Sequence, residues 1–170
     1  QQVYDEITSD ETLHGADLAE AFIDYIADTT DYSARYSSLN GILTTNSGDC
    51  WASVAYFNAL CEMAGFEVRT RNATADTGAG SGHRNSVVKV DGKYYIADSG
   101  YSGTAPRYRS FKEEVDGLYL NNRGVLIQYD AFDVKDVVIP SISNGITITD
   151  IGVDSLDRTV FGLYDNVTSV

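Results

Sequence analysis

Residues 47–65 read SGDCWASVAYFNALCEMAG and predict a buried helix that begins at a cysteine. Neither Pro nor Gly interrupts residues 50–64, and Gly65 supplies a common helix stop. The few polar side chains fall on one narrow side of this helix: Ser53, Asn58 and Glu62. Because most of the circumference is apolar, we expect the helix to lie at the centre of the fold, with Cys50 in its first turn.

The two cysteines of the chain, Cys50 and Cys61, stand eleven residues apart in this helix. They would lie about 16 Å apart along the axis, whereas a disulfide needs Cα atoms within about 7 Å. We therefore expect two free thiols. Their spacing does not suit a metal site, and neither a metal nor a cofactor is expected. Cys61, among apolar neighbours, is expected to be inert, whereas Cys50 lies at a helix N-terminus, where a thiol is readily activated.

Residues 86–97 read SVVKVDGKYYIA and predict a β-hairpin. Asp91-Gly92 lies between two runs rich in β-forming residues, which is typical of a two-residue type I′ turn. This turn sets Val90 opposite Lys93 and thereby fixes every further pair along the two strands.

The same register brings a histidine close to an aspartate. Asn85 faces Asp98, and His83 is then a diagonal neighbour of Asp98 on one face, with the two Cα atoms about 7–8 Å apart. Val87 and Ile96 share this face and are expected to pack against the buried helix. One sheet face thus offers a histidine and an aspartate, and the helix expected to cover it begins with a cysteine.

These three residue types in this arrangement indicate covalent catalysis. The helix N-terminus and a neighbouring imidazolium favour the thiolate of Cys50, which is the nucleophilic form. His83 would carry the proton, and Asp98 would orient its ring. The backbone N–H of Cys50, unsatisfied at the helix start, can donate to an oxyanion. Further candidates for the oxyanion hole or the substrate groove are Asn46, Trp51 and Asn85.

Outside these segments the chain reads as a mixture of helices and strands. Residues 9–28 carry an amphipathic stripe with Ser9 as the expected N-cap, and a weaker helix is expected at 33–44. Residues 66–71 alternate as a strand does, and short strands are expected from residue 136 onward. The fold class is therefore expected to be α+β.

The composition argues against several functional classes. The 170 residues are 43% apolar, which allows a sizeable core, and carry a formal net charge of −13. This charge disfavours polyanionic partners, so neither nucleic acid nor an anionic membrane surface is expected. No run of about 20 apolar residues occurs, and no membrane insertion is expected. Because the chain lacks an initiator Met, we expect it to be a processed or cut piece of a longer protein.

Four motifs in order resemble the transglutaminase-like core: GDCWA at 48–52, LCEMAGFEVR at 60–69, His83, and VKVDGKYYIAD at 88–98. The resemblance covers about residues 33–100. It implies a papain-like α+β fold and a catalytic triad made of the cysteine, histidine and aspartate named above. The family includes protein crosslinkers, cysteine peptidases and peptide N-glycanases, so the motifs indicate the chemistry better than the substrate.

Two positions depart from the pattern of that family. An aromatic residue commonly stands two places after the histidine, where this chain has Asn85, and Tyr94 replaces the usual Trp. Both departures leave the triad intact and concern the substrate groove.

The C-terminal segment resembles leucine-rich repeats of bacterial surface proteins. The similar stretches are VVIP at 137–140, GITITDIG at 145–152 and NVTSV at 166–170. Repeat units do not bury their faces singly, so we expect an array cut within a repeat and continued beyond the last residue. The expected organisation is a catalytic domain over 1–135 and a partial repeat-like β segment over 136–170.

The sequence thus predicts a papain-like, transglutaminase-like α+β core with a buried helix packed on an antiparallel sheet, plus a short β-rich tail. The expected function is cysteine-dependent acyl transfer on amide bonds of an extracellular protein or peptide, with a peptidase or amidase as the leading interpretation. Two alternatives stay open: a transglutaminase-type crosslinker, and a non-enzymatic adhesion module on a repeat stalk. The expected location is extracellular or at a bacterial cell surface, and the oligomeric state is left open.

Overall fold

The computed structural model describes residues 1–73, 83–99, 109–114, 118–120, 123–129, 137–143 and 145–152. The chain divides into two compact units, 1–114 and 115–170, and each is described by itself. The expected domain boundary between residues 135 and 136 stays a prediction. In the described part of the chain, no helix is both long enough and apolar enough to cross a membrane.

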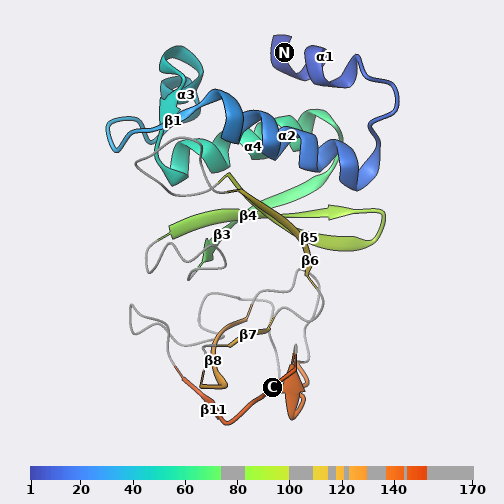
Figure 1. The fold of residues 1–170 in the computed structure, drawn as a ribbon, viewed down its shortest axis with the longest axis vertical. Helices are drawn as coiled ribbons and strands as arrows, with labels where there is room; N and C mark the ends of the chain where they lie inside the picture. The colour runs from blue at the N-terminus through green and yellow to red at the C-terminus, as the bar shows by residue number, and fades with distance from the viewer. Residues whose placement is uncertain are drawn as a thin grey trace. The chain divides into compact units, whose positions relative to one another are not determined.

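The first unit contains a layer of helices on one face of a four-stranded antiparallel sheet, in the strand order β3-β4-β5-β6 (Figure 1). Its helices are α1 (Gln2–Thr8), α2 (Gly15–Thr29), α3 (Leu39–Thr45) and α4 (Cys50–Met63). The strands of the sheet are β3 (Glu67–Ala73), β4 (His83–Val90), β5 (Lys93–Asp98) and β6 (Ser110–Glu114). Two short strands, β1 (Asp31–Tyr32) and β2 (Ser47–Gly48), pair in parallel just before α4. The expected α+β class, with a helix that begins at Cys50 packed on an antiparallel sheet, is confirmed.

The predicted hairpin is confirmed together with its register. Asp91 and Gly92 both have positive φ, at 50° and 79°, as a type I′ turn requires. β4 and β5 pair from Val90 opposite Lys93 onward, in the register that the turn predicts.

The prediction that Val87 and Ile96 pack against the buried helix is wrong, because the neighbouring residue of each strand faces the helix instead. Both are buried, but the core that includes α4 takes Val88, Val90 and Ala97 from β4 and β5. Because side chains alternate along a strand, Val87 points to the opposite face from its neighbour Val88. Residues 85–88 read Asn-Ser-Val-Val, which shows no polar–apolar alternation from which the face could be chosen. In the structure all four are buried.

The predicted helix over 9–28 is observed only from Gly15 onward, as α2, and the separate helix α1 lies before the predicted range. Ser9 is the C-cap of α1 rather than an N-cap, and α2 begins only at Gly15. Between them the backbone N–H and the hydroxyl of Thr12 both donate to Asp10 Oδ1, at 3.0 and 2.6 Å. This local turn competes with the helix, and Gly15 has a φ of +52°, through which a right-handed helix does not run. The weaker helix expected at 33–44 is the shorter α3.

Helix α4 begins at Cys50 because Asp49 caps it. Asp49 Oδ1 accepts from the N–H of Ala52 at 3.1 Å, and its Oδ2 accepts from the Ser37 hydroxyl at 2.5 Å. The backbone N–H of Asp49 donates to the carbonyl of Tyr36 at 2.9 Å. The start of the helix is therefore fixed by side-chain and backbone bonds on both sides of the cap.

Replacing Asp49 with Ala should lower the free energy of unfolding by about 1 kcal/mol, since a lost N-cap costs about 0.5–2 kcal/mol. Asp17→Ala is a suitable control, because Asp17 is an exposed acidic residue in the first turn of α2. Urea unfolding of the two variants measures the difference. Equal losses in both would show that the effect comes from helix-dipole charge and not from the cap.

The second unit, described over five short strands, has its own small core. The strands are β7 (Leu118–Leu120), β8 (Val125–Tyr129), β9 (Ile142–Ser143), β10 (Ile146–Thr147) and β11 (Asp150–Ile151). β8 pairs with β7 on one side and with β11 on the other, and β9 pairs with β10. Leu118, Leu126 and Val137 form the buried cluster. The repeat-like stretch 166–170 lies outside the described residues.

Candidate active site

Cys50, His83 and Asp98 come together in the first unit. Cys50 is the first residue of α4, His83 the first of β4 and Asp98 the last of β5. His83 Nε2 lies 2.6 Å from Asp98 Oδ2, and both side chains are almost fully buried. Regular β4–β5 pairing ends at Ser86 and Ala97, so the two site residues stand just beyond the paired part of the hairpin.

The electrostatics of His83 are set by its two partners. Burial by itself lowers the pKa of this imidazole, but the hydrogen bond with Asp98, the proximity of the Cys50 thiol and the charges of both raise the pKa to about 9. Asp98 interacts with Nε2 of the His83 ring, so Nδ1 is the ring nitrogen that can interact with the Cys50 thiol. His83 thus stands between a carboxylate and a thiol, and the protonated form of its ring is favoured.

The raised pKa of His83 predicts that the protein loses stability as the pH rises from about 6.5 to about 9. In this range the folded state keeps the proton, whereas the unfolded chain, with a histidine pKa of 6.5, releases it. The stabilising contribution is therefore complete below about pH 6.5 and absent above about pH 9. Urea unfolding from about pH 6 to 8.5 should show a falling free energy of unfolding. A His83→Gln variant should give a flatter profile, and the same slope in both proteins would contradict the prediction.

Cys61 has the opposite environment to Cys50. Both cysteines are free thiols, as predicted, and Cys61 is fully buried while Cys50 is half-buried. Burial raises the pKa of the Cys61 thiol far above its ordinary value, and the charge of Glu62 adds to the effect. Cys61 is therefore held in its unreactive protonated form.

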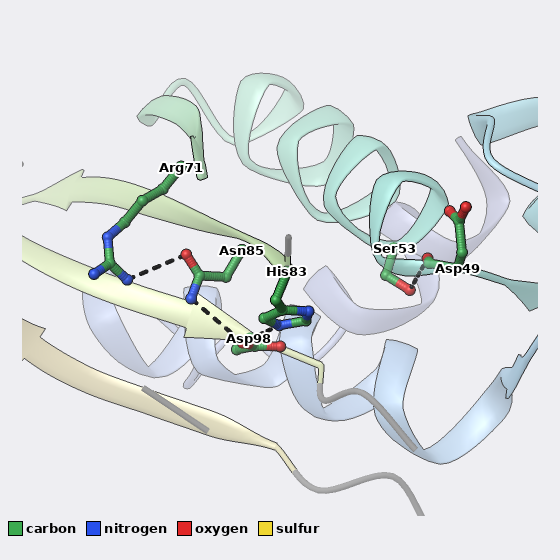
Figure 2. A network of polar contacts seen from close by, with 6 residues as sticks. All are labelled: Asp49, Ser53, Arg71, His83, Asn85 and Asp98. Carbon is green, nitrogen blue, oxygen red and sulfur yellow. Dashed lines mark hydrogen bonds and ion pairs between the residues drawn. The ribbon is translucent and has the colours of Figure 1, made fainter. Parts of the chain in front are cut away.

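A buried polar network continues from Asp98 away from Cys50. Arg71 on β3 lies directly opposite Asn85 on β4, and its Nη1 donates to Asn85 Oδ1 at 3.3 Å. Asn85 Nδ2 in turn donates to Asp98 Oδ2 at 3.3 Å. Figure 2 shows these side chains in a row that leads through His83 toward the start of α4. Because a guanidinium only donates, Arg71 determines which end of the amide is the oxygen and so turns the NH₂ group toward Asp98.

The remaining candidates from the sequence lie in three different settings. Asn46 ends α3 in the left-handed conformation, with a φ of 51°, and is exposed. Trp51 is 50% exposed beside Cys50. Asn85 is buried with both ends of its amide bound to Arg71 and Asp98. Oxyanion or groove roles for the three residues stay predictions.

Sequence reasoning missed several residues that shape the site. Asp49 had a readable signal, since an Asp directly before an apolar helix is a common N-cap. Ser53, whose hydroxyl donates to the carbonyl of Asp49 at 3.0 Å, follows from the helical spacing once the cap is known. Arg71 gave no signal of its own, because a charged residue in an alternating strand reads as exposed, whereas here it is only 1% exposed.

A small cavity adjoins the reacting groups. Its volume is about 10 Å³, and Cys50, Ser53, His83, Asp98 and Ser99 are among its lining residues. This volume is about what one water molecule needs. Within the described ranges, no three His, Cys, Asp or Glu side chains gather as a metal site would require.

Comparison with protein families shows which family the chain belongs to. The model of the transglutaminase-like superfamily matches residues 1–123, and the chain therefore belongs to this superfamily. Among solved structures, the crystal structure of a TGase is similar with a TM-score of 0.49 and 18% identity, over 60% of this chain and 31% of that chain. A protein from Cytophaga hutchinsonii, described as a candidate cysteine protease, gives a TM-score of 0.44 and 20% identity, over 48% of this chain and 30% of that chain. The match thus spans about a third of each of these longer chains, and no curated protein is significantly similar in sequence.

Proposed function

We propose that the protein is a cysteine hydrolase that cleaves amide bonds of proteins or peptides, with Cys50 as nucleophile, His83 as acid and base, and Asp98 as the orienting group. The observation that carries the proposal is the position of His83. Its Nε2 is hydrogen-bonded to Asp98 Oδ2 at 2.6 Å, and its ring interacts with the Cys50 thiol at the N-terminus of α4. Members of this superfamily use such a triad for acyl transfer, as the sequence motifs implied.

The proposed reaction has two steps. In the first, the Cys50 thiolate attacks the amide carbon, His83 gives its proton to the leaving nitrogen, and the C–N bond breaks to leave a thioester. In the second, His83 takes a proton from water, the hydroxide forms the new C–O bond, and the C–S bond breaks to return the thiolate. The backbone N–H of Cys50, at the start of α4, would donate to the oxyanion of both tetrahedral intermediates.

We take water as the second reactant because the sequence shows no feature dedicated to an amine acceptor. A transglutaminase-type crosslinker is the second candidate, since it would use the same thioester. Incubation with a glutamine-containing peptide and a primary amine distinguishes them: incorporated amine indicates crosslinking, and released acid indicates hydrolysis.

The biological setting is also proposed. We propose that the protein lies outside the cell or on a bacterial cell surface, and that residues 136–170 are a repeat-like segment, on the sequence resemblance alone. A non-enzymatic adhesion module would fit the same setting, but it would not need the three residues to meet with a protonated histidine between an acid and a thiol.

The test of the proposed chemistry is selective labelling of one thiol. Iodoacetamide at neutral pH should modify Cys50 and leave Cys61 unmodified, because only Cys50 has both an imidazole and a helix N-terminus beside it. Intact mass and peptide mapping give the site and the rate. His83→Ala should slow the labelling of Cys50 strongly, whereas His14→Ala, which changes an exposed histidine, should leave it unchanged. Equal labelling of both cysteines, or a rate independent of His83, would overturn the proposal.

A further inference from the structure

The site lies at the end of the β4–β5 hairpin, beyond the regular pairing of its two strands. β4 pairs with β3 as far as His83, and β5 pairs with β6 as far as Asp98. β4 and β5 pair with each other only from the turn to Ser86 and Ala97. Beyond this point side chains link the two strands, since His83 and Asn85 on β4 both reach Asp98 on β5.

Two groups meet on one oxygen of Asp98. Its Oδ2 lies 2.6 Å from His83 Nε2 and accepts from Asn85 Nδ2 at 3.3 Å. A carboxylate oxygen has two lone pairs, so each group can occupy one of them. Asp98 is 2% exposed and Asn85 1% exposed, so water does not readily replace a lost bond. The bond from Asn85 therefore fixes the rotation of the carboxylate and directs the second lone pair of Oδ2 to His83.

The amide of Asn85 is itself held in one orientation. Arg71 lies directly opposite Asn85 in the β3–β4 pairing, and its Nη1 donates to Asn85 Oδ1 at 3.3 Å. If the amide turned over, its NH₂ group would face the guanidinium and its oxygen would face the carboxylate, and both contacts would be repulsive. The order of the row in Figure 2, from Arg71 through Asn85 to Asp98 and His83, thus gives the amide a single favourable orientation.

We propose that Asn85 is a positioning residue for the reaction: it holds the Asp98 carboxylate in the rotation in which Oδ2 accepts from His83, and thereby keeps the imidazole turned toward Cys50. This inference adds a fourth residue to the triad and rests on the acyl-transfer function proposed for Cys50. Asn85 acts through Asp98 and takes no part in bond making. The role differs from the oxyanion or groove role expected from the sequence, because the two ends of the amide are bound to Arg71 and Asp98.

The test measures the rate at which iodoacetamide alkylates Cys50 at neutral pH, followed by intact mass. This reaction forms no oxyanion, so an oxyanion donor leaves its rate unchanged, whereas a His83 ring that loses its orientation stabilises the thiolate less and slows it. In Asn85→Leu, where the side chain keeps a similar size, we expect the rate to fall by about tenfold, the lower end for a lost hydrogen bond to a charged group.

Two comparisons separate positioning from a general packing effect. Asn58→Leu is the matched control, because the amide of Asn58 also uses both ends, donating to Thr70 and accepting from the Ser86 hydroxyl, and this variant should leave the rate unchanged. The second comparison repeats Asn85→Leu in an Asp98→Asn protein. With no carboxylate left to position, the substitution should cause no further fall there, which is the coupling expected of two residues that act as a unit.

The possible outcomes are distinct for the two proposals. A fall in Asn85→Leu that is absent from Asn58→Leu and from the Asp98→Asn background supports the positioning role. An unchanged rate in Asn85→Leu, or an equal fall in either comparison, overturns it, while the acyl-transfer proposal stands as long as labelling depends on His83. A rate independent of His83 overturns both. If circular dichroism shows that Asn85→Leu does not fold, Asn85→Ser, whose side chain is too short to join Arg71 to Asp98, replaces it in the same comparisons and is judged in the same way.

Discussion

Replacing Asp98 with Asn should lower kcat by about 10⁴-fold while the fold is retained, as the same change does in a serine triad. The Asn side chain can occupy the same space, but it is neutral and offers an NH₂ donor where His83 needs an acceptor. The hydrogen bond and the charge that raise the pKa of His83 would both be lost, and the ring would be free to adopt the wrong tautomer. Turnover of a peptide amide by wild type and variant measures the effect.

Asp17→Asn is the matched control for this prediction, since Asp17 is an exposed aspartate on α2 and should retain full activity. Cys50→Ala should abolish turnover under the same conditions. If Asp98→Asn keeps activity within about threefold of wild type, the loss is less than about 1 kcal/mol of transition-state stabilisation, and Asp98 does not orient the base.

Replacing Phe57 with Ala should lower the free energy of unfolding by about 3–5 kcal/mol, as for other large core truncations. Phe57 is fully buried in the middle of α4, inside the core that joins the helices to the sheet. Domains are stable by only about 5–15 kcal/mol, so this variant should be partly unfolded under mild conditions. Urea unfolding at 25 °C gives the value. Leu43→Ala, at a half-exposed position on α3, should cost less than about 1 kcal/mol, and similar losses in both would mean that the core is wrongly placed.

The parts of the fold that the sequence predicted well are those set by local rules. Asp91-Gly92 permits one turn type, which fixes the pairing of β4 with β5 and brings His83 and Asp98 together. The limits of α4 follow from a mostly apolar run without Pro or Gly between Asp49 and Gly65. These features need no knowledge of what packs against them.

The parts that could not be predicted depend on contacts between distant segments. The pairing of Arg71 with Asn85 depends on the register of β3 against β4. The sequence between these two strands contains no two-residue turn motif from which that register could be predicted. The stacking of Arg84 on Trp51 needs the placement of α4 over the sheet. Within one strand, the choice between Val87 and Val88 for the helix-facing side could not be made, because both are buried. Each of these features is determined by tertiary packing and not by local propensity.

The hairpin that joins His83 to Asp98 has a consequence for the order in which the chain acquires reactivity. A hairpin closed by a two-residue turn forms on a timescale of about 1–10 μs, because its contacts are close in sequence. Cys50 joins the pair only when α4 docks on the sheet, which requires contacts over longer separations. We therefore expect the base and its carboxylate to assemble early and the thiol to be activated late. A nascent or partly folded chain would then carry an ordinary cysteine, protected from premature side reactions until the rest of the unit has closed around it.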